Sequence, residues 1–480
     1  MRVSGPVVVG LDVGTTGAKA VAFRAGTEWR RAAEREYRLE QPEVQDPDVV
    51  MEAVHAALAE CAPDDVAAIA VSTAMHGLIG LDADRRPVMP LLTWADPRAT
   101  PQAEALRPRA RELLARTGTP VHPMSPLAKL IWFRECDPDT ARRVRHWAGL
   151  KDYVLLQLTG ELVTELSTAS ASGLLNLQTR DWDPEALALA GIDADKLPPI
   201  RATTDTIPGK DGIPIVLGAT DGPLGNLGTG ALGRGIAGLT LGTSGALRMV
   251  VDAPRPDPAG ALFCYALTDD RWVLGGPVSN GGIVVRWAQD ALAPDLDGDE
   301  ALLALAASVP AGSEGLAMLP YLMAERAPLW APELPGAYLG LRRHHTRAHL
   351  ARAAIEGVCL QLATILGRLD AIEPVTEVRA TGGALRARLW RDILAATLDR
   401  PLVAVGDAKG TAVGAAALGL LALGCADSLE AAVAMLPSPT MSERVEPDPE
   451  LVEVYAASRA ALPGLIRALN PVADLLDGRT

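Results

Sequence analysis

The stretch that decides the fold is Gly10-Leu11-Asp12-Val13-Gly14-Thr15-Thr16-Gly17-Ala18-Lys19. It lies between two apolar runs, 7–9 and 20–23, and so predicts a β-hairpin with a tight turn at residues 14–17. Glycines allow the backbone to approach a ligand closely, and threonine hydroxyl and N–H groups can surround an anion. With the carboxylate of Asp12 and the ammonium group of Lys19, these residues predict a phosphate-binding turn. The alternative for a single hairpin of this kind is an ordinary glycine-rich turn.

A second copy of the pattern lies about half the chain further on. It reads Gly238-Leu239-Thr240-Leu241-Gly242-Thr243-Ser244-Gly245-Ala246-Leu247. A repeat at this spacing predicts two domains of one fold, each with a phosphate-binding hairpin, and we place them at 1–230 and 231–480. Thr240 replaces Asp12 and Leu247 replaces Lys19, so the charged groups that can direct a metal belong to the first copy.

Composition narrows the class of protein. Hydrophobic residues make up 49% of the chain and charged residues 22%, as in a soluble globular protein. The net charge is −14 and no block of Lys or Arg occurs, which argues against nucleic acid or an anionic membrane surface as a partner. Five scattered cysteines without a C-x-x-C pair, and no signal peptide before the first strand, predict reduced thiols, no structural zinc and a cytoplasmic location.

Chemistry-bearing residues follow several of the predicted strands. A buried strand at 215–220 ends at Asp221, and a shorter apolar strand at 66–72 leads into Met75 and His76. Open α/β sheets bind their ligands at such strand ends. Segment 222–238 is predicted to be a glycine-rich link, and helices are predicted at 101–117, 281–291, 346–369, 388–398, 411–424 and 450–469.

Two longer patterns identify a family. They are Met124-Ser125-Pro126-Leu127-Ala128-Lys129-Leu130-Ile131-Trp132-Phe133, and Gly336-Ala337-Tyr338-Leu339-Gly340-Leu341 followed after seven residues by His349-Leu350-Ala351-Arg352-Ala353-Ala354-Ile355-Glu356. Over essentially its whole length the chain resembles the FGGY family of carbohydrate kinases. The resemblance implies an α/β fold of two ribonuclease-H-like domains, as in actin/hexokinase-like ATPases, around a nucleotide-binding cleft. It also implies that the last helix packs back on the N-terminal domain.

Shorter phrases make the chain look most like the gluconate kinases of this family. They are Thr73-Ala74-Met75-His76, Thr93-Trp94-Ala95-Asp96, Val121-His122-Pro123-Met124-Ser125-Pro126, Gly173-Leu174-Leu175-Asn176-Leu177 and Phe263-Cys264-Tyr265-Ala266-Leu267-Thr268. This implies ATP- and Mg²⁺-dependent phosphorylation of D-gluconate to 6-phosphogluconate. The alternatives are a kinase for xylulose or another pentulose or polyol, and, from a different class, a non-kinase actin-like ATPase. Whether the chain forms a homodimer is left open.

The resemblance also assigns roles to residues. Asp221 matches the catalytic base, and Asp12 would orient Mg²⁺ through water. The predicted ATP-binding residues are Thr15, Thr16 and Lys19 on one side, Gly242, Thr243 and Ser244 on the other, and Gly382 and Gly383 at the adenosine. Any single residue of the last segment has the alternative role of a helix-entry turn.

The acceptor sugar needs an apolar surface and hydroxyl partners. Met75, His76, Trp94, Asp96 and Arg98 provide both and are the predicted substrate-binding residues. A gluconate carboxylate also needs a cation, and Arg98, Lys151 and Arg326 are the candidates among which the sequence does not choose. His76 and Arg326 have structural alternatives, as a core histidine and an exposed ion pair.

Overall fold

The computed structural model describes residues 5–39, 41, 43–406, 410–438 and 440–476. By its internal contacts the chain forms two compact units, each made of three segments. The first unit is Met1–Leu232, Val250–Leu274 and Ala408–Pro439, and the second is Gly233–Met249, Gly275–Asp407 and Thr440–Thr480. Both units contain sheets with helices packed on them, so the predicted α/β class is confirmed. The division into domains at 230/231 stays a prediction.

The first unit is built on a six-stranded mixed sheet. Its order is β11 (Thr206–Pro208), β12 (Pro214–Thr220), β5 (Val66–Thr73), β1 (Val7–Val13), β2 (Gly17–Arg24) and β3 (Arg30–Glu36). β12, β5 and β1 are parallel, and β1 and β2 form the predicted hairpin with residues 14–16 between them. Thr220 pairs with Thr73, and Thr73 with Val13, so these three strands end in one row.

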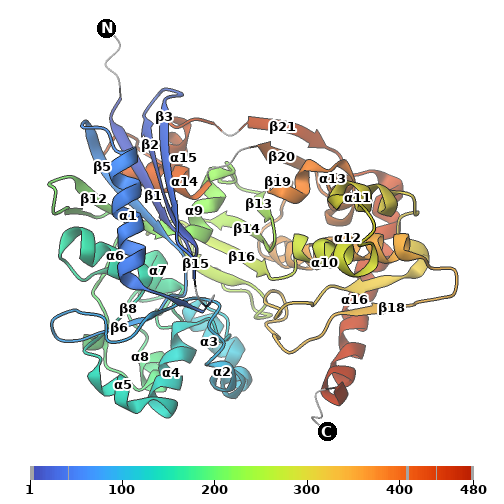
Figure 1. Ribbon diagram of the computed structural model, residues 1–480, viewed down its shortest axis with the longest axis horizontal. Coiled ribbons are helices and arrows are strands. Elements are labelled where there is room, and N and C mark those ends of the chain that lie inside the picture. The colour runs from blue at the N-terminus through green and yellow to red at the C-terminus, as the bar shows by residue number, and fades with distance from the viewer. Residues whose placement is uncertain (1–4, 40, 42, 407–409, 439, 477–480) are drawn as a thin grey trace. The chain divides into compact units, whose positions relative to one another are not determined.

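Alternation along β1 separates the two faces of this sheet. Val7, Val9 and Leu11 belong to a core that also contains residues of α1 (Pro47–Cys61) and α6 (Leu150–Thr159). Val8 belongs to a second core, shared with α9 (Asp221–Gly228) and α14 (Gly410–Ala422). The strand period of two residues therefore buries both faces, as expected for parallel strands. Figure 1 shows α1 lying along the sheet beside β2 and β3.

Shorter elements complete the first unit. They are β4 (Val44–Gln45), β6 (Ile79–Leu81), β7 (Leu91–Leu92), β8 (His146–Ala148), β9 (Thr164–Glu165), β10 (Ile200–Arg201), β15 (Phe263–Ala266), α2 (Thr100–Leu106), α3 (Ala110–Thr117), α4 (Pro126–Cys136), α5 (Pro138–Arg143), α7 (Leu166–Ser170), α8 (Pro184–Ala190) and α15 (Leu429–Ala434). The single helix predicted at 101–117 is interrupted by a 3₁₀ turn, Arg107–Arg109. Pro108 in this turn lacks the N–H that a continuous helix requires.

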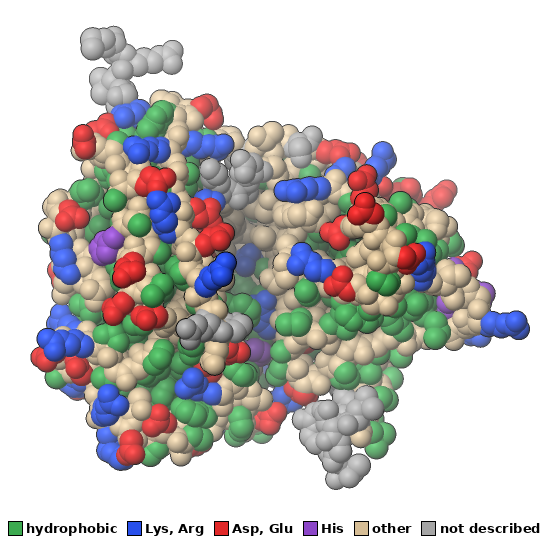
Figure 2. All heavy atoms as spheres, viewed as in Figure 1, with side chains coloured by type: hydrophobic (Ala, Val, Ile, Leu, Met, Phe, Trp, Pro, Cys, Tyr) green, Lys and Arg blue, Asp and Glu red, His purple; other side chains and the backbone are tan. Residues whose placement is uncertain are grey.

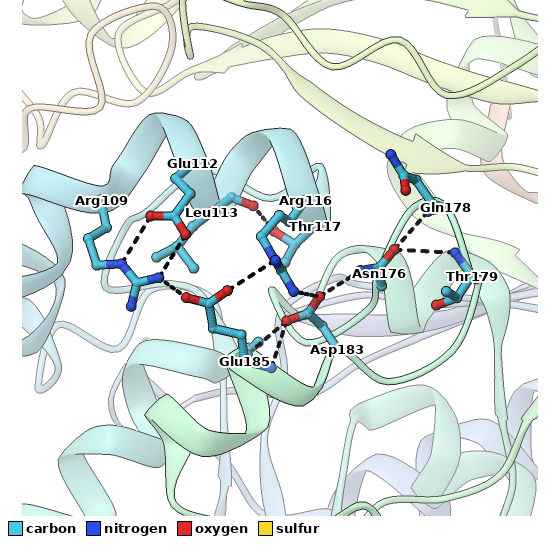
Figure 3. A network of polar contacts seen from close by, with 11 residues as sticks. Arg109, Glu112, Leu113, Arg116, Thr117, Asn176, Gln178, Thr179, Asp183 and Glu185 are labelled. Atoms are coloured by element: carbon cyan, nitrogen blue, oxygen red, sulfur yellow. Dashed lines mark hydrogen bonds and ion pairs between the residues drawn. The ribbon is translucent and has the colours of Figure 1, made fainter.

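A polar network joins α3 to α8 (Figure 3). Asp183 caps α8 by accepting from the N–H groups of Glu185 and Ala186, and its other oxygen accepts from Arg116 Nη2 (2.8 Å) and Asn176 Nδ2 (2.7 Å). Burial acts to raise the pKa of Asp183, but these hydrogen bonds outweigh burial and hold the pKa below its ordinary value. The network fixes the turn at 176–181 against α3.

The second sheet has seven strands. Its order is β15, β16 (Trp272–Val278), β14 (Gly245–Val251), β13 (Ile236–Leu241), β19 (Glu377–Thr381), β20 (Leu402–Gly406) and β21 (Thr440–Val445). β13 and β14 form the second predicted hairpin. The remaining elements of the second unit are β17 (Ala317–Leu319), β18 (Ala337–Leu339), α10 (Gly282–Leu292), α11 (Gly298–Ala307), α12 (Arg347–Ile372), α13 (Arg388–Leu398) and α16 (Pro449–Leu476).

Two long helices of the second unit, α12 and α16, are packed against other elements of the protein. Among the described residues α12 is the one helix long and apolar enough to cross a membrane, but 83% of its most apolar window is buried, as in a core helix. The last helix, α16, packs against α12 and α13 within its own unit. On the face shown in Figure 2, acidic and basic side chains are interspersed, with no block of Lys or Arg.

Candidate active site

Asp12 is the penultimate residue of β1 and is held by two hydroxyl groups. Ser72, its partner in β5, donates to Oδ1 (2.8 Å), and Thr411 at the start of α14 donates to Oδ2 (2.5 Å). Burial raises the pKa of Asp12, while these hydrogen bonds and the nearby Lys19 act to lower it. Lys19 is the cross-strand partner of Asp12, and its ammonium group lies 3.9 Å from the carboxylate of Glu34. The charges that distinguish the first hairpin therefore sit side by side.

The turn of the first hairpin is held from one side by donors. Tyr37 Oη donates to the carbonyl of Gly14 (2.6 Å), and Gln45 Nε2 donates to the carbonyl of Thr15 (2.8 Å). In a trans peptide the C=O and the following N–H point in opposite directions. The N–H groups of Thr15 and Thr16 therefore point away from these side chains, as a turn that binds phosphate requires.

The segment directly after β5, which we call the acceptor segment because it carries the predicted substrate-binding residues Met75 and His76, has an unusual backbone conformation. His76 has φ = 65°, and its Nδ1 lies 2.8 Å from the carbonyl oxygen of Ala171. A fully buried ammonium group, Lys129 Nζ, donates to the carbonyls of His76 (3.0 Å) and Thr93 (2.6 Å). Lys129 thus joins the two segments that carry the predicted acceptor residues. Burial lowers the pKa of Lys129 to about 7.

The other acceptor residues lie on or next to these segments. Met75 packs against the core beneath α14, and Trp94, with 39% of its surface exposed, donates from Nε1 to Thr15 Oγ1 (3.1 Å). Asp96 is 2% exposed and accepts from Arg98 Nε at 2.9 Å. The structure therefore connects Trp94 to the turn of the first hairpin and pairs Asp96 with Arg98. The substrate contacts of all five residues stay predictions.

Asp221 is the first residue of α9, directly after β12. Its Oδ1 accepts from the N–H of Gly222 (2.7 Å), and a helix N-terminus favours a negative charge. The prediction of a glycine-rich link at 222–238 was wrong for its first part, because residues 221–228 are helical. The glycines serve close packing: a Cβ on Gly228 would lie 2.0 Å from the Cα of Gly410 in α14.

The structure corrects one candidate for a carboxylate-binding cation. Lys151 has no exposed side-chain surface, and its ammonium group donates to three backbone carbonyls, so it is not available to a substrate. Arg326, in the second unit, donates to Ser279 Oγ (3.1 Å) and to the carbonyl of Val278 (3.2 Å). Arg98 is paired with Asp96 and lies over the ring of Trp132 (4.9 Å to the centroid).

The turn of the second hairpin is held by backbone N–H groups at the start of a helix. The N–H groups of Gly282 and Ile283, at the start of α10, donate to the carbonyls of Gly242 (2.8 Å) and Thr243 (3.1 Å). By the same peptide geometry, the N–H groups of Thr243 and Ser244 point the other way. Both hairpin turns therefore have their carbonyls bound from one side.

A cavity of about 880 Å³ lies next to this second turn. Gly242, Thr243, Gly383 and Trp390 are among its lining residues, so the second hairpin and the predicted adenosine segment meet in one cavity. Its size is in the range of small-molecule and cofactor sites. Gly382 has φ = 122°, and a Cβ there would lie 2.2 Å from the carbonyl oxygen of Leu241. Gly382 thus shapes this segment without lining the cavity.

The side chains at this site fit a metal ion that binds together with the phosphates of ATP. Within the described residues no group of three or more His, Cys, Asp or Glu side chains could hold a metal ion. Mg²⁺ keeps several waters and bridges phosphates, and needs only one or two protein carboxylates. Asp12, at the end of β1 beside the first turn, can supply one.

These features define a carbohydrate kinase when they are set beside known proteins. Residues 7–228 match the N-terminal domain and residues 237–423 the C-terminal domain of the FGGY family of carbohydrate kinases, and the chain belongs to this family. It is 38% identical to the gluconokinase of Bacillus subtilis (strain 168) over 463 residues, which cover 90% of each chain.

Solved structures give the same family. The chain superposes on gluconate kinase from Lactobacillus acidophilus with a TM-score of 0.92 and 32% identity, covering 97% of this chain and 98% of that one. A ligand-bound xylulose kinase from the same species gives a TM-score of 0.91 and 33% identity over the same shares. The family excludes the alternative of a non-kinase actin-like ATPase.

Two residues that contact the first turn, Tyr37 and Gln45, carried no signal in the sequence patterns. Tyr37 and Gln45 lie in a polar stretch, and their contacts to the first turn depend on how β3 and β4 fold back. Lys129 and Lys151 are more accessible to reasoning, because each stands in an apolar helix, where a buried lysine needs partners. A lysine inside such a run is a signal that a sequence reader could use.

Proposed function

We propose that the chain transfers the γ-phosphoryl group of ATP to a hydroxyl of D-gluconate, giving 6-phosphogluconate and ADP in the cytoplasm. One observation carries the proposal. Val13, Thr73 and Thr220 form one row of the first sheet, and three segments begin directly beyond this row: the phosphate turn, the acceptor segment and Asp221. In the proposal, the residues that bind the phosphates of ATP, the residues that bind the acceptor and the catalytic base Asp221 therefore come from three neighbouring strand ends.

In this proposal Asp221 is the general base. Its carboxylate accepts the proton of the substrate hydroxyl, the hydroxyl oxygen attacks the γ-phosphorus, and the bond to the ADP oxygen breaks. The N–H groups of Thr15 and Thr16 and the ammonium group of Lys19 stabilise the charge on the transferred group. Mg²⁺, when bound with ATP, neutralises phosphate charge, and Asp12 is the residue that would hold it.

The two units contribute different ligands. In the second unit the cavity lined by Gly242, Thr243 and Gly383 suits the nucleoside part of ATP. In the first unit, His76, Trp94, Asp96 and Arg98 are proposed to bind the sugar acid. Of the three candidate cations, Arg98 is the one in the acceptor segments, and we propose that it meets the carboxylate.

The identity of the acceptor sugar is the part of the proposal that has an alternative. Xylulose is the second candidate, because the ligand-bound xylulose kinase is as similar in fold and identity as the gluconate kinase. The test is an ADP-release assay over gluconate, xylulose, ribulose, glycerol and erythritol, compared by kcat/KM. Gluconate should exceed the others by at least tenfold; a ketose that turns over while gluconate is inert contradicts the assignment.

The base is tested by Asp221→Asn. The amide cannot take the proton, so turnover should fall roughly 10²–10⁴-fold, the usual contribution of a general base. The KM for ATP should change little, because Asp221 is not proposed to contact the nucleotide. Turnover within threefold of the wild type removes Asp221 from this role.

A further inference from the structure

A buried cation lies beneath the strand that leads to Asp221. Lys151 is the second residue of α6, and its side chain has no exposed surface. Its Nζ donates to the carbonyls of Val71 (2.5 Å), Leu217 (3.0 Å) and Ala219 (2.9 Å). Val71 belongs to β5 and the other two residues to β12, so one ammonium group joins the strand before the acceptor segment to the strand before the base.

An irregularity in β12 makes these carbonyls available. The register between β12 and β5 shifts between Val216 and Ala219. Gly218 has φ = 71°, and a Cβ there would lie 1.9 Å from the carbonyl oxygen of Val71. A bulge of this kind leaves backbone groups outside the ladder, and buried groups need other partners. The ammonium group of Lys151 provides them just before the strand ends at Asp221.

A second chain of contacts leads from Lys151 to the same strand end. Glu165 Oε1 lies 3.8 Å from Lys151 Nζ, and Glu165 caps α7 by accepting from the N–H groups of Ser167 (2.5 Å) and Thr168 (3.0 Å). Ser167 Oγ lies 2.9 Å from Thr220 Oγ1 and accepts from the N–H of Thr220 (3.2 Å). Lys151, Glu165, Ser167 and Thr220 are all buried.

Four carboxyl groups on different elements act on this single ammonium group. Glu165 ends β9, Asp152 is the next residue of α6, Asp12 is on β1 and Asp221 begins α9; all four interact electrostatically with Lys151. Burial lowers the pKa of Lys151 to about 8, and the four carboxyl groups act to raise it. The positive charge of Lys151 therefore interacts electrostatically with both Asp12 and Asp221.

We propose that Lys151, supported by Glu165 and Ser167, is a positioning residue for the phosphoryl transfer: it fixes the end of β12 directly before Asp221 and places a positive charge that interacts with the Asp221 carboxylate. Lys151 does not touch the substrate, so its effect passes through Asp221. The inference rests on the proposed function, in which Asp221 is the base. A purely structural lysine would instead change stability and leave the kinetics of the folded enzyme unaltered.

The first experiment compares wild type with Lys151→Met, which keeps the length of the side chain and removes its charge and donors. We expect kcat to fall about 10–100-fold, with the KM values for ATP and acceptor within about threefold. Removing a nearby positive charge disfavours a carboxylate, so the acid limb of the kcat–pH profile should move up by about one unit. An unshifted limb or an unchanged kcat overturns the inference.

Lys129→Met is the matched control. Lys129 is equally buried in the same unit and also donates to backbone carbonyls, but those of His76 and Thr93. Its loss should raise the acceptor KM and leave the acid limb in place. If both variants give the same pattern, the effect of Lys151→Met reflects general loss of a buried lysine, and the inference is wrong.

A double-mutant cycle with Asp221→Asn separates the inference from the proposed function. If Lys151 acts through Asp221, then Lys151→Met should reduce kcat less than threefold in the Asp221→Asn background. If the losses of kcat caused by the two substitutions multiply in the double mutant, the inference is overturned. If Asp221→Asn alone turns over like the wild type, the proposed role of Asp221 as the base is overturned. Should Lys151→Met not fold, Ser167→Ala takes its place in the cycle, with a loss of about 3–10-fold expected in the wild-type background.

Discussion

The hydrogen bonds from Tyr37 and Gln45 to the turn of the first hairpin predict the effect of Gln45→Leu. Gln45 is 2% exposed, and its Nε2 donates to the carbonyls of Thr15 (2.8 Å) and Gly14 (3.2 Å). Leucine has a similar size and no donor. Gly14 keeps its hydrogen bond from Tyr37 (2.6 Å), so the loss falls on the carbonyl of Thr15.

The size of the effect follows from that one carbonyl. A buried acceptor that loses its donor costs about 1–3 kcal/mol, and the peptide can relieve this by rotating. Rotation turns the carbonyl of Thr15 toward the phosphate side and the N–H of Thr16 away from it. Since about 1.4 kcal/mol corresponds to a tenfold change in an equilibrium constant, the KM for ATP should rise roughly 5–100-fold.

The assay is the initial rate of ADP release with ATP varied at saturating acceptor, and with acceptor varied at saturating ATP. The acceptor KM should stay within about twofold, because Gln45 contacts the turn and not the acceptor segments. Gln45→Glu, which places a carboxylate against the same carbonyls, should raise the KM for ATP further, and Tyr37→Phe is the milder comparison. A folded Gln45→Leu enzyme whose KM for ATP is unchanged would refute the reasoning.

Three further predictions concern single positions. Gly382→Ala should weaken ADP binding at least tenfold by calorimetry, because its Cβ would meet the carbonyl oxygen of Leu241 at 2.2 Å and its φ is 122°. Asp183 has a pKa below its ordinary value, so its ionised form stabilises the folded protein above the unfolded-state pKa, and this stabilisation is lost as pH falls through the folded-state pKa. Asp183→Ala should therefore lower the free energy of unfolding, measured in urea, by about 2–4 kcal/mol at pH 7 and by less near pH 3. Glu325 is the opposite case, because burial raises its pKa to about 8: the wild type should lose stability relative to Glu325→Gln as pH rises from about 4.5 to 8, and parallel curves would contradict this.

Local patterns in the sequence were enough to predict the two hairpins and helix α13. The two hairpins appear where the glycine–threonine turns place them, and α13 has the predicted bounds, Arg388–Leu398. These predictions succeeded because each depends on residues close in the chain: turn glycines, apolar periodicity and the polar residue at a strand end. The family resemblance, carried by two long patterns, is confirmed by matches over both halves of the chain.

Features that depend on distant partners were not predicted. The helix at Asp221 was expected to be a glycine-rich link, since glycine disfavours helices when no tertiary packing is considered. Here Gly228 and Gly414 allow α9 and α14 to approach so closely that a Cβ on Gly414 would lie 2.4 Å from the carbonyl oxygen of Leu224. Lys151 was one of three candidate cations for a substrate carboxylate, and its actual partners were not predicted because they lie on β5 and β12, far away in the sequence.

The two hairpins show how one local pattern can depend on different surroundings. The turn at 14–17 has its carbonyls bound by side chains, Tyr37 and Gln45, whereas the turn at 242–245 has them bound by the N-terminus of α10. A helix N-terminus carries positive potential and lies behind the second turn, whose copy of the pattern has Leu247 where the first copy has Lys19. Among the described residues, the side chains that bind the carbonyls of the first turn, Tyr37 and Gln45, are neutral, and Lys19 is the cation of this copy. The charge difference between the copies is thus the counterpart of a difference in what supports each turn.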